Sequence, residues 1–507
     1  MHALHARRTR SARRRITAAS SAVVLLAGIA ACSPGGQDHR VEFVDEAPAS
    51  EVIEGDDPTA TALATSSALF ESADVAVVAA ADSAEALGSL SAEARLPLLV
   101  GTDSAVTEEL DRLGADILVT AAGTDLGELA EGREVIEVDP ASDDAADSLP
   151  EVAVDEEPAG ASAFVDPDDP AAAQAVAMAN VEAAGGTVVE VSGGDPRFNG
   201  DTVAATRDAL GEDGSGTGGL LAVGAGFGSA EEFAGNVQTA LTVPELPGGG
   251  QVAFPGRRMV AAYGSPGVPS LGILGEQDLE STIERVTELA EDYEPHSEVP
   301  VVPAFEIITT VASASPGPDG NYSTELDAEL IREWVDAAGE AGVYVVLDLQ
   351  PGHTDFLTQA KLYEDLLREP HVGLALDPEW RLKPGQRHMA QIGSVPAAEI
   401  NETADWLAQL TAENGLPQKV FILHQFSHGM ITDRQDVDTS HPELAMLLHA
   451  DGHGTPDLKM GTWNALQEGL PEGIRMAWKN FYDEDTPTFT PEQTYEVEPR
   501  PWFVSYQ

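Results

Sequence analysis

Two acidic residues stand two positions apart in the segment "GLALDPEW", where Asp377 and Glu379 follow a run of small and apolar residues. If this segment is a strand, both side chains lie on one face and start about 6.6 Å apart. Retaining glycoside hydrolases hold two carboxyls about 5 Å apart, and inverting ones hold them about 6.5–9.5 Å apart. The spacing therefore predicts an acid–base pair, in which Asp377 raises the pKa of Glu379 and keeps Glu379 protonated as the general acid.

Polar residues also end the other apolar runs of the C-terminal half. Glu306 and Asp348 end two earlier runs, and either is predicted to be the base or nucleophile opposite Glu379. In a binding protein without turnover, the same carboxylates accept hydrogen bonds from sugar hydroxyls. Further residues are predicted to contact the substrate by stacking or hydrogen bonding: Tyr263, Gln350, Trp380, His424, Gln425, His449, Asp451, Lys479 and Trp478.

Histidines suggest an alternative chemistry. The segment "HADGHG" contains His449, Asp451 and His453, and His424 and His428 lie in and after the preceding apolar run. Histidine and carboxylate ligands are typical of zinc, so a metal-dependent hydrolase is a further alternative. The motif H-E-x-x-H is absent, and the sequence predicts no metal and no other cofactor.

These residues depend on regularly spaced elements for their positions. Amphipathic helical stretches at 279–293, 328–342, 358–370, 397–415 and 460–470 separate most of the strand-like runs. Strand followed by helix, repeated over about 250 residues, is the plan of a (β/α)8 TIM barrel, here residues 257–507; an open doubly wound sheet is the alternative. Because active sites of this barrel lie at the carboxyl ends of the strands, the polar residues are predicted to meet at its mouth. The strand-like runs are 258–264, 299–308, 342–350, 371–380, 419–426, 444–452, 473–481 and 501–507.

The barrel half resembles glycoside hydrolase-like barrels, some of which end a strand with D-x-E. The resemblance implies a fold with a carbohydrate site. In the large retaining clan of these enzymes a glutamate ends the seventh strand, whereas here Lys479 and Asn480 stand at that place.

The N-terminal half is predicted to hold α/β modules, one over 61–138 and a second, possibly a diverged repeat, over 161–250, with an acidic linker over 139–160. The first module resembles the cell wall-binding repeat 2 family through Ser67–Phe70, Ala73-Asp74, Pro97-Leu98-Leu99, Glu109-Leu110 and Arg112-Leu113-Gly114-Ala115. This resemblance implies an α/β fold that binds cell wall polymers. The overall fold class is therefore α/β, with these modules preceding the barrel.

The first residues have the features of an export signal. Arginines precede a short apolar stretch that ends in Ile29-Ala30-Ala31-Cys32, which resembles a bacterial lipobox. Residues 1–31 are thus predicted to be a lipoprotein signal peptide, Cys32 the lipidated residue, and 32–60 an acidic tether. We expect a protein anchored by lipid alone to the outer face of the cell membrane.

The composition limits the classes of partner that the protein is expected to bind. The chain has 27 Lys+Arg against 86 Asp+Glu, a formal charge of −59, which disfavours nucleic acid and anionic lipid. The barrel half, with the wall-binding-like region before it, also resembles actinobacterial lipoproteins that join such a region to a glycoside hydrolase-like barrel. The leading hypothesis is a cell wall-associated surface lipoprotein whose barrel binds or hydrolyses an envelope polysaccharide or another carbohydrate. The alternative is a non-catalytic binding or scaffold lipoprotein.

Overall fold

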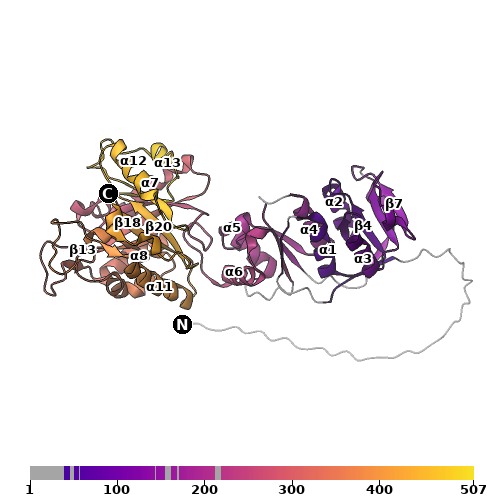
Figure 1. Cartoon of the computed structure of the whole chain (residues 1–507), viewed down its shortest axis with the longest axis horizontal. Helices are drawn as coiled ribbons and strands as arrows, with labels where there is room; N and C mark the ends of the chain where they lie inside the picture. Colours follow the sequence, from indigo (N-terminus) through magenta and orange to yellow (C-terminus); the bar gives the residue numbers. More distant parts are fainter. Residues whose placement is uncertain are drawn as a thin grey trace, which may run out of the picture. The chain divides into compact units, whose positions relative to one another are not determined.

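The computed structural model describes residues 39–45, 51–55, 57–142, 144–154, 161–167, 171–211 and 219–507. By their contacts, residues 39–507 group into one unit, and its helices and strands are labelled in Figure 1. The predicted signal peptide and the predicted lipidation at Cys32 lie outside the described residues. Within those residues, every helix is too short or too polar to cross a bilayer.

The C-terminal half is a closed barrel of eight parallel strands, which confirms the predicted TIM barrel and rules out an open sheet. The first barrel strand, β12, pairs with β13 on one side and with the last strand, β22, on the other, so the sheet has no free edge. Every barrel strand overlaps a predicted run, and β13 continues four residues past the end of its run at 308. The barrel strands are β12 (Arg258–Gly264), β13 (Val301–Ala312), β15 (Tyr344–Leu349), β16 (Val372–Leu376), β18 (Lys419–Gln425), β20 (Leu444–Ala450), β21 (Arg475–Asn480) and β22 (Phe503–Tyr506).

The helices around the barrel form an incomplete ring. The predicted helix over 358–370 is instead divided by a 3₁₀ turn, η8 (Lys361–Tyr363), and β18 is joined to β20 by η10 (His428–Met430), β19 (Ile431–Thr432) and η11 (Arg434–Asp436). β19 pairs with β17 (Val395–Pro396), which ties the segment after β18 to the segment after β16. The helices are α7 (Leu279–Glu291), α8 (Ala328–Glu340), α9 (Phe356–Ala360), α10 (Glu364–Leu367), α11 (Ala397–Glu413), α12 (Pro456–Gln467) and α13 (Pro491–Tyr495).

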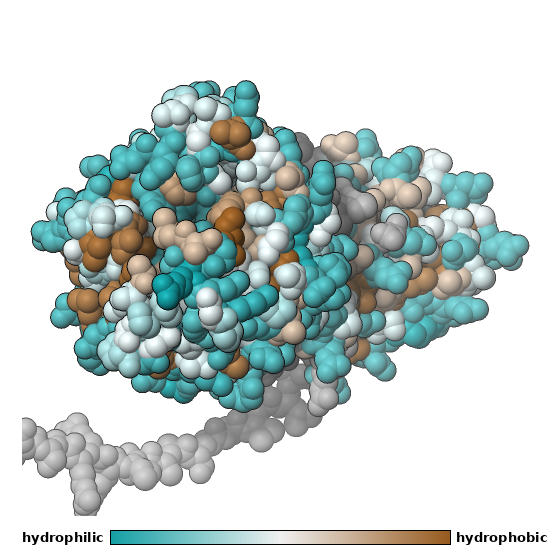
Figure 2. All heavy atoms as spheres, turned by 60° about the vertical axis from the view of Figure 1, so that its left-hand side comes forward, coloured by the Kyte–Doolittle hydropathy of each residue, from teal (hydrophilic) through white to brown (hydrophobic). Residues whose placement is uncertain are grey.

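Alternation along the strands separates two hydrophobic cores. Inward side chains such as Ala304, Val346 and Ile422 fill the barrel, whereas outward ones such as Phe305 and Val345 pack under the helices. Further toward the carboxyl ends, inward positions are taken by charged residues, so the floor of the mouth is ionisable. On the face of the barrel shown in Figure 2, hydrophilic side chains predominate and hydrophobic ones gather in separate patches.

Before the barrel, the described residues form three small sheets. A parallel sheet of β4 (Val75–Ala79), β5 (Leu98–Val100), β6 (Ile117–Ala121) and β7 (Glu134–Val138) lies in the first predicted module. A second sheet contains β9 (Ser162–Val165), β10 (Thr187–Glu190), β11 (Leu220–Val223) and β2 (Glu51–Ile53), and a third contains β1 (His39–Phe43), β3 (Phe70–Ala73) and β8 (Val152–Val154).

Parts of the predicted tether, 32–60, and of the predicted linker, 139–160, belong to sheets. β1 and β2 lie in the predicted tether and β8 lies in the predicted linker, and all three pair with other strands. In β1 the apolar side chains of Val41 and Phe43 alternate with exposed polar ones and are buried, which explains why this acidic stretch is ordered.

One hydrophobic core joins residues of both predicted modules, and the second module has further clusters of its own. Asn180, on α4 (Ala171–Ala183) of the second, is fully buried against Leu98 of the first. Its Oδ1 accepts from the Leu98 amide at 2.7 Å, and its Nδ2 donates to Thr65 Oγ1 of α1 (Pro58–Leu69) at 2.8 Å. Burying this amide is favourable only because it is bonded on both sides.

Candidate active site

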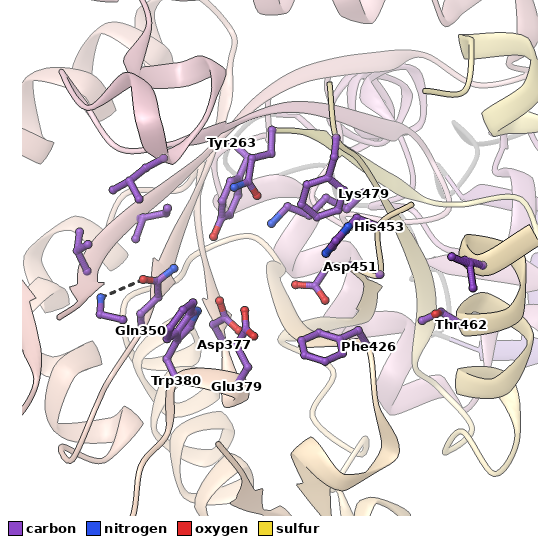
Figure 3. A pocket seen from close by; sticks show the side chains of 18 residues that line it. Tyr263, Gln350, Asp377, Glu379, Trp380, Phe426, Asp451, His453, Thr462 and Lys479 are labelled. Carbon is purple, nitrogen blue, oxygen red and sulfur yellow. Dashed lines mark hydrogen bonds between the residues drawn. The ribbon is translucent and has the colours of Figure 1, made fainter. Parts of the chain in front are cut away.

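The mouth of the barrel contains a cavity of about 540 Å³. Each barrel strand, or the segment directly after it, contributes to the lining, as expected at the carboxyl ends of the strands. Figure 3 shows the polar part of the lining, with Asp377, Glu379 and Asp451 turned toward the same space. The lining residues are Tyr263, Leu271, Ile308, Val311, Ala312, Gln350, Asp377, Glu379, Trp380, Phe426, Asp451, Gly452, His453, Leu458, Thr462, Lys479, Phe481 and Gln507.

The acidic pair is not carried by a strand, so the predicted i, i+2 strand geometry is wrong. β16 ends at Leu376, and the 3₁₀ turn η9 (Pro378–Trp380) begins two residues later, after Asp377. Pro378 has no amide hydrogen to continue the ladder, and its restricted φ suits the first position of a turn. The turn is held by the Glu379 carbonyl, which accepts from Gly393 N at 2.6 Å. Both carboxyl groups nevertheless reach the cavity.

Three carboxyl groups meet in the cavity wall. One oxygen each of Asp377, Glu379 and Asp451 lies within 4.8 Å of the other two. Burial, then repulsion by Glu379 and Asp348, raises the pKa of Asp377 well above its usual value. Burial and the charge of Asp451 raise the pKa of Glu379 to about 7. Asp377 and Glu379 thus hold protons under conditions where most carboxyl groups have lost them.

Asp451 behaves in the opposite way. Burial alone raises the pKa of its carboxyl, but the hydrogen bond from His424 and the charge of Lys479 outweigh burial and lower it. His424 Nδ1 lies 3.3 Å from Asp451 Oδ2. The wall therefore combines a protonated Glu379 with an ionised Asp451, which is the division of roles that acid–base catalysis needs.

A second layer of charge lies beneath the wall. His424 Nε2 is 2.8 Å from Glu306 Oε1, and His449 Nδ1 is 3.6 Å from the same oxygen. Burial opposes ionisation of Glu306, but the two histidines outweigh it and hold its pKa well below the usual range. Burial likewise disfavours the charged form of His424, yet Glu306 and Asp451 raise its pKa well above the usual value. His424 is therefore an imidazolium between two carboxylates.

Asp348 also belongs to this lower layer. Its Oδ2 accepts a hydrogen bond from Tyr263 Oη at 2.9 Å. Burial is the main reason that the pKa of Asp348 rises to about 6, with His424 acting against it. Asp348, Glu306, His424 and His449 do not themselves line the cavity.

Lysines complete the electrostatics. Lys479 Nζ lies 3.5 Å from the centroid of the Tyr263 ring, a close cation–π contact. Behind the wall, Lys459 of α12 lies 2.8 Å from Asp485 Oδ2 and donates to the carbonyls of Gly452 and Lys479 at 3.1 and 2.6 Å. Asp485 in turn accepts from the amides of Gly454 and Phe481, each at 2.9 Å. This buried pair holds the two segments that carry Asp451 and Lys479.

Two groups of side chains in the barrel mouth have metal-ligand spacing: Glu306 with His424 and His449, and Asp377 with Glu379 and Asp451. The two nitrogens of His424 face the carboxylates of Asp451 and Glu306, so a metal ion bound by His424 would take the place of a proton shared with one of them. In the carboxylate group, protons and the Lys479 ammonium already offset the negative charge. Among the described residues, the predicted set His449, Asp451 and His453 does not come together as a ligand group.

Of the other predicted site residues, Tyr263, Gln350, Trp380 and Lys479 line the cavity, whereas Gln425 and Trp478 do not. Gln425 is bonded to the Ser427 carbonyl and to Arg434. Trp478 points outward and packs on Trp463 at 5.3 Å between ring centroids. Its neighbour Lys479 points inward, so strand alternation already indicated this orientation.

Several lining residues were missed in the sequence, chiefly apolar ones: Phe426, Leu458 and the aliphatic group Leu271, Ile308, Val311 and Ala312. Phe426 directly follows β18 and was recognisable from its position. Leu458 lies on a helix, and no periodic signal distinguishes it from an ordinary surface residue.

No protein-family model matches this chain, and no curated protein matches it. One solved structure with some likeness is the quadruple mutant of alpha-N-acetylgalactosaminidase NagBb from Bifidobacterium bifidum. It is 13% identical, with 44% of this chain and 43% of that chain covered, at a TM-score of 0.22. The chain thus spans less than half of that protein, and the likeness is too weak to argue from.

Proposed function

We propose that the barrel hydrolyses a glycosidic bond, with Glu379 as general acid and Asp451 as nucleophile. One observation carries the proposal: in the wall of a cavity, one oxygen of the Glu379 carboxyl, whose pKa is raised, lies within 4.8 Å of one oxygen of the Asp451 carboxyl, whose pKa is lowered. Retaining glycoside hydrolases hold their two carboxyls about 5–5.5 Å apart, too close for the water that an inverting enzyme needs between them.

The chemistry follows from these two groups. Asp451 attacks the anomeric carbon while Glu379 gives its proton to the departing glycosidic oxygen, so the carbon–oxygen bond breaks and a glycosyl ester forms. Glu379, now ionised, then takes a proton from water, whose oxygen displaces Asp451 from the anomeric carbon. The sugar is released with its original anomeric configuration, and both carboxyl groups return to their starting states.

The surrounding residues support this division of roles. His424 and Lys479 keep Asp451 ionised, and a protonated Asp377 can donate a hydrogen bond to a sugar oxygen. Trp380, Phe426 and Phe481 line the cavity and offer ring faces or edges for sugar rings. Glu306 and Asp348, predicted as base or nucleophile, act from the layer below by holding His424 and Tyr263.

The test uses residues 39–507 and a panel of aryl glycosides and polysaccharides. We expect the released sugar to retain its anomeric configuration. NMR of the freshly released product measures this configuration. Glu379→Gln should lose activity most on substrates with poor leaving groups, and Asp451→Asn should lose it on all of them. Inverted product contradicts the nucleophile. If the protein binds members of the panel but hydrolyses none of them, it is a carbohydrate receptor and not an enzyme.

The proposed location is the outer face of the cell membrane, with the cell wall within reach. This part of the proposal rests on the sequence alone, on the lipobox-like segment at Cys32 and on the resemblance of residues 61–138 to wall-binding repeats. In the native host, a labelled fatty acid should be incorporated into the wild type and not into Cys32→Ser. Co-sedimentation of residues 39–507 with purified walls tests wall binding.

A further inference from the structure

Exposed apolar side chains gather around the mouth of the barrel. Large hydrophobic residues with more than a third of their surface exposed occur at seven positions from β12 onward. Two of them, Leu330 and Leu362, lie on α8 and η8 of the outer layer. The other five lie on segments that follow the carboxyl ends of β12, β16, β20 and β21: Val268, Met389, Ile392, Leu458 and Tyr482.

Contacts tie these segments to the cavity. Leu458 lines it directly and is 64% exposed. The Val268 carbonyl accepts from the amide of Leu271, another lining residue, and Tyr482 N donates to the carbonyl of the lining residue Gln507. The exposed residues therefore form a rim around the cavity, rather than scattered single side chains of the kind found on any surface.

The segment after β16 also carries unpaired positive charge. Lys383 and Arg387 are exposed, and neither makes an ion pair with a carboxylate among the described residues. Arg381, by contrast, lies 2.7 Å from Glu399. The same segment bears Met389, which is 88% exposed, and it is attached to the cavity wall where the rings of His388 and Trp380 lie 5.2 Å apart. In a chain with a formal charge of −59, this segment combines cations with apolar side chains.

The apolar surface continues from the rim into the cavity. Leu271, Ile308, Val311 and Ala312 are among its lining residues, and Gln350 Oε1 accepts from Ala312 N at 3.0 Å. A free saccharide makes its contacts through hydroxyl groups and ring faces and has no group that needs an aliphatic wall. A saccharide that bears an acyl or alkyl chain has such a group, because the chain is apolar and packs against aliphatic side chains.

We propose that the mouth of the barrel docks on a lipid surface and takes its saccharide from a glycolipid. The rim residues enter the interfacial region of the lipid, as amphipathic anchors do, and Lys383 and Arg387 face lipid phosphates. The acidic remainder of the surface is repelled by the same phosphates, which orients the mouth toward the membrane. The saccharide part rests on the proposed function, whereas the docking part does not.

Vesicle binding tests the docking. Residues 39–507 form one compact unit and lack the apolar N-terminal stretch, which could bind lipid by itself. We expect this unit to co-sediment with phosphatidylcholine vesicles, whose headgroups supply phosphates without a net negative charge. Leu458→Asp should weaken binding about tenfold or more, whereas Leu362→Asp, the same change at a residue 55% exposed away from the rim, should not. The double variant Lys383→Ala/Arg387→Ala should weaken binding mainly at low salt.

The outcomes separate the two proposals. No binding, or equal loss in Leu458→Asp and Leu362→Asp, overturns the docking. If the protein binds vesicles but hydrolyses no glycoside, the docking proposal stands and the proposed hydrolysis is wrong. If kcat/KM for octyl glycosides is no higher than for methyl glycosides, the proposed hydrolysis stands but a glycolipid substrate is ruled out.

Discussion

His424 Nε2 lies 2.8 Å from Glu306 Oε1, and neither side chain is exposed to solvent. Glu306→Gln leaves the buried imidazolium without this partner, which typically costs about 3–5 kcal/mol of unfolding free energy. Chemical denaturation measures this loss. Asp405→Asn is the matched control, because Asp405 pairs with His441 at the same 2.8 Å but is 63% exposed; we expect it to cost less than about 1 kcal/mol. Equal losses of unfolding free energy in Glu306→Gln and Asp405→Asn would contradict a buried, protonated His424.

The proposed hydrolysis should fall as pH rises through about 7, because the Glu379 carboxyl must be protonated and its pKa is raised to about 7. On the acid side, activity should persist until Asp451 takes up a proton, below the usual range of an aspartate. The profile of kcat/KM against pH measures both limits. Glu379→Gln should lose the alkaline limit together with about 10²–10⁴ in rate. An alkaline limit that survives in this variant belongs to another group.

Stability should depend on pH through the same residue. The pKa of Glu379 is raised from 4.5 to about 7 in the folded chain, so the folded state holds a proton that the unfolded state releases between these values. The wild type is therefore fully stabilised below about pH 4.5 and loses stability as pH rises toward 7. Relative to the wild type, Glu379→Gln should gain on the order of 3 kcal/mol between these limits. A difference that stays constant with pH contradicts the raised pKa.

The buried pair of Lys459 and Asp485 should be essential to the cavity wall. Lys459→Met leaves Asp485 buried without its cation and frees the Gly452 and Lys479 carbonyls, so we expect a loss of about 3–5 kcal/mol and of hydrolysis. Thermal unfolding and activity measure the two effects. Lys361→Met is the control, since Lys361 is exposed and only approaches the Trp406 ring at 6.0 Å; its cost should stay below about 1 kcal/mol.

Hydrolysis should also survive chelation. A zinc hydrolase built on the mouth histidines needs neutral imidazoles, whereas His424 is held protonated by Glu306 and Asp451. We therefore expect unchanged kcat/KM after dialysis against EDTA. Loss of activity on dialysis, with recovery on adding Zn²⁺ or Ca²⁺, favours the metal-dependent alternative.

The barrel was predictable because apolar runs and amphipathic helices repeat clearly along residues 258–507. The mouth was only partly predictable. At Pro378 the chain forms a turn where a continued strand was predicted. Asp377 and Glu379 line the cavity from this turn and the residue before it. No pattern in the sequence indicates which inward residues lie beneath the wall, since the depth of Glu306 and His424 depends on strand register and tilt. The apolar rim consists of single residues on irregular segments, where no periodicity marks them.

The length of β13 has a consequence for how a ligand is received. Its last residues extend past the barrel and pair antiparallel with β14 (Ser323–Glu325), through Thr310 with Glu325 and Ala312 with Ser323. The aliphatic wall at Ile308, Val311 and Ala312 is thus part of a hydrogen-bonded sheet and keeps its shape before any ligand arrives. A ligand that binds against it orders little backbone and loses little of its binding free energy to conformational entropy. The amide protons of this stretch should exchange slowly with solvent, and to the same extent before and after binding.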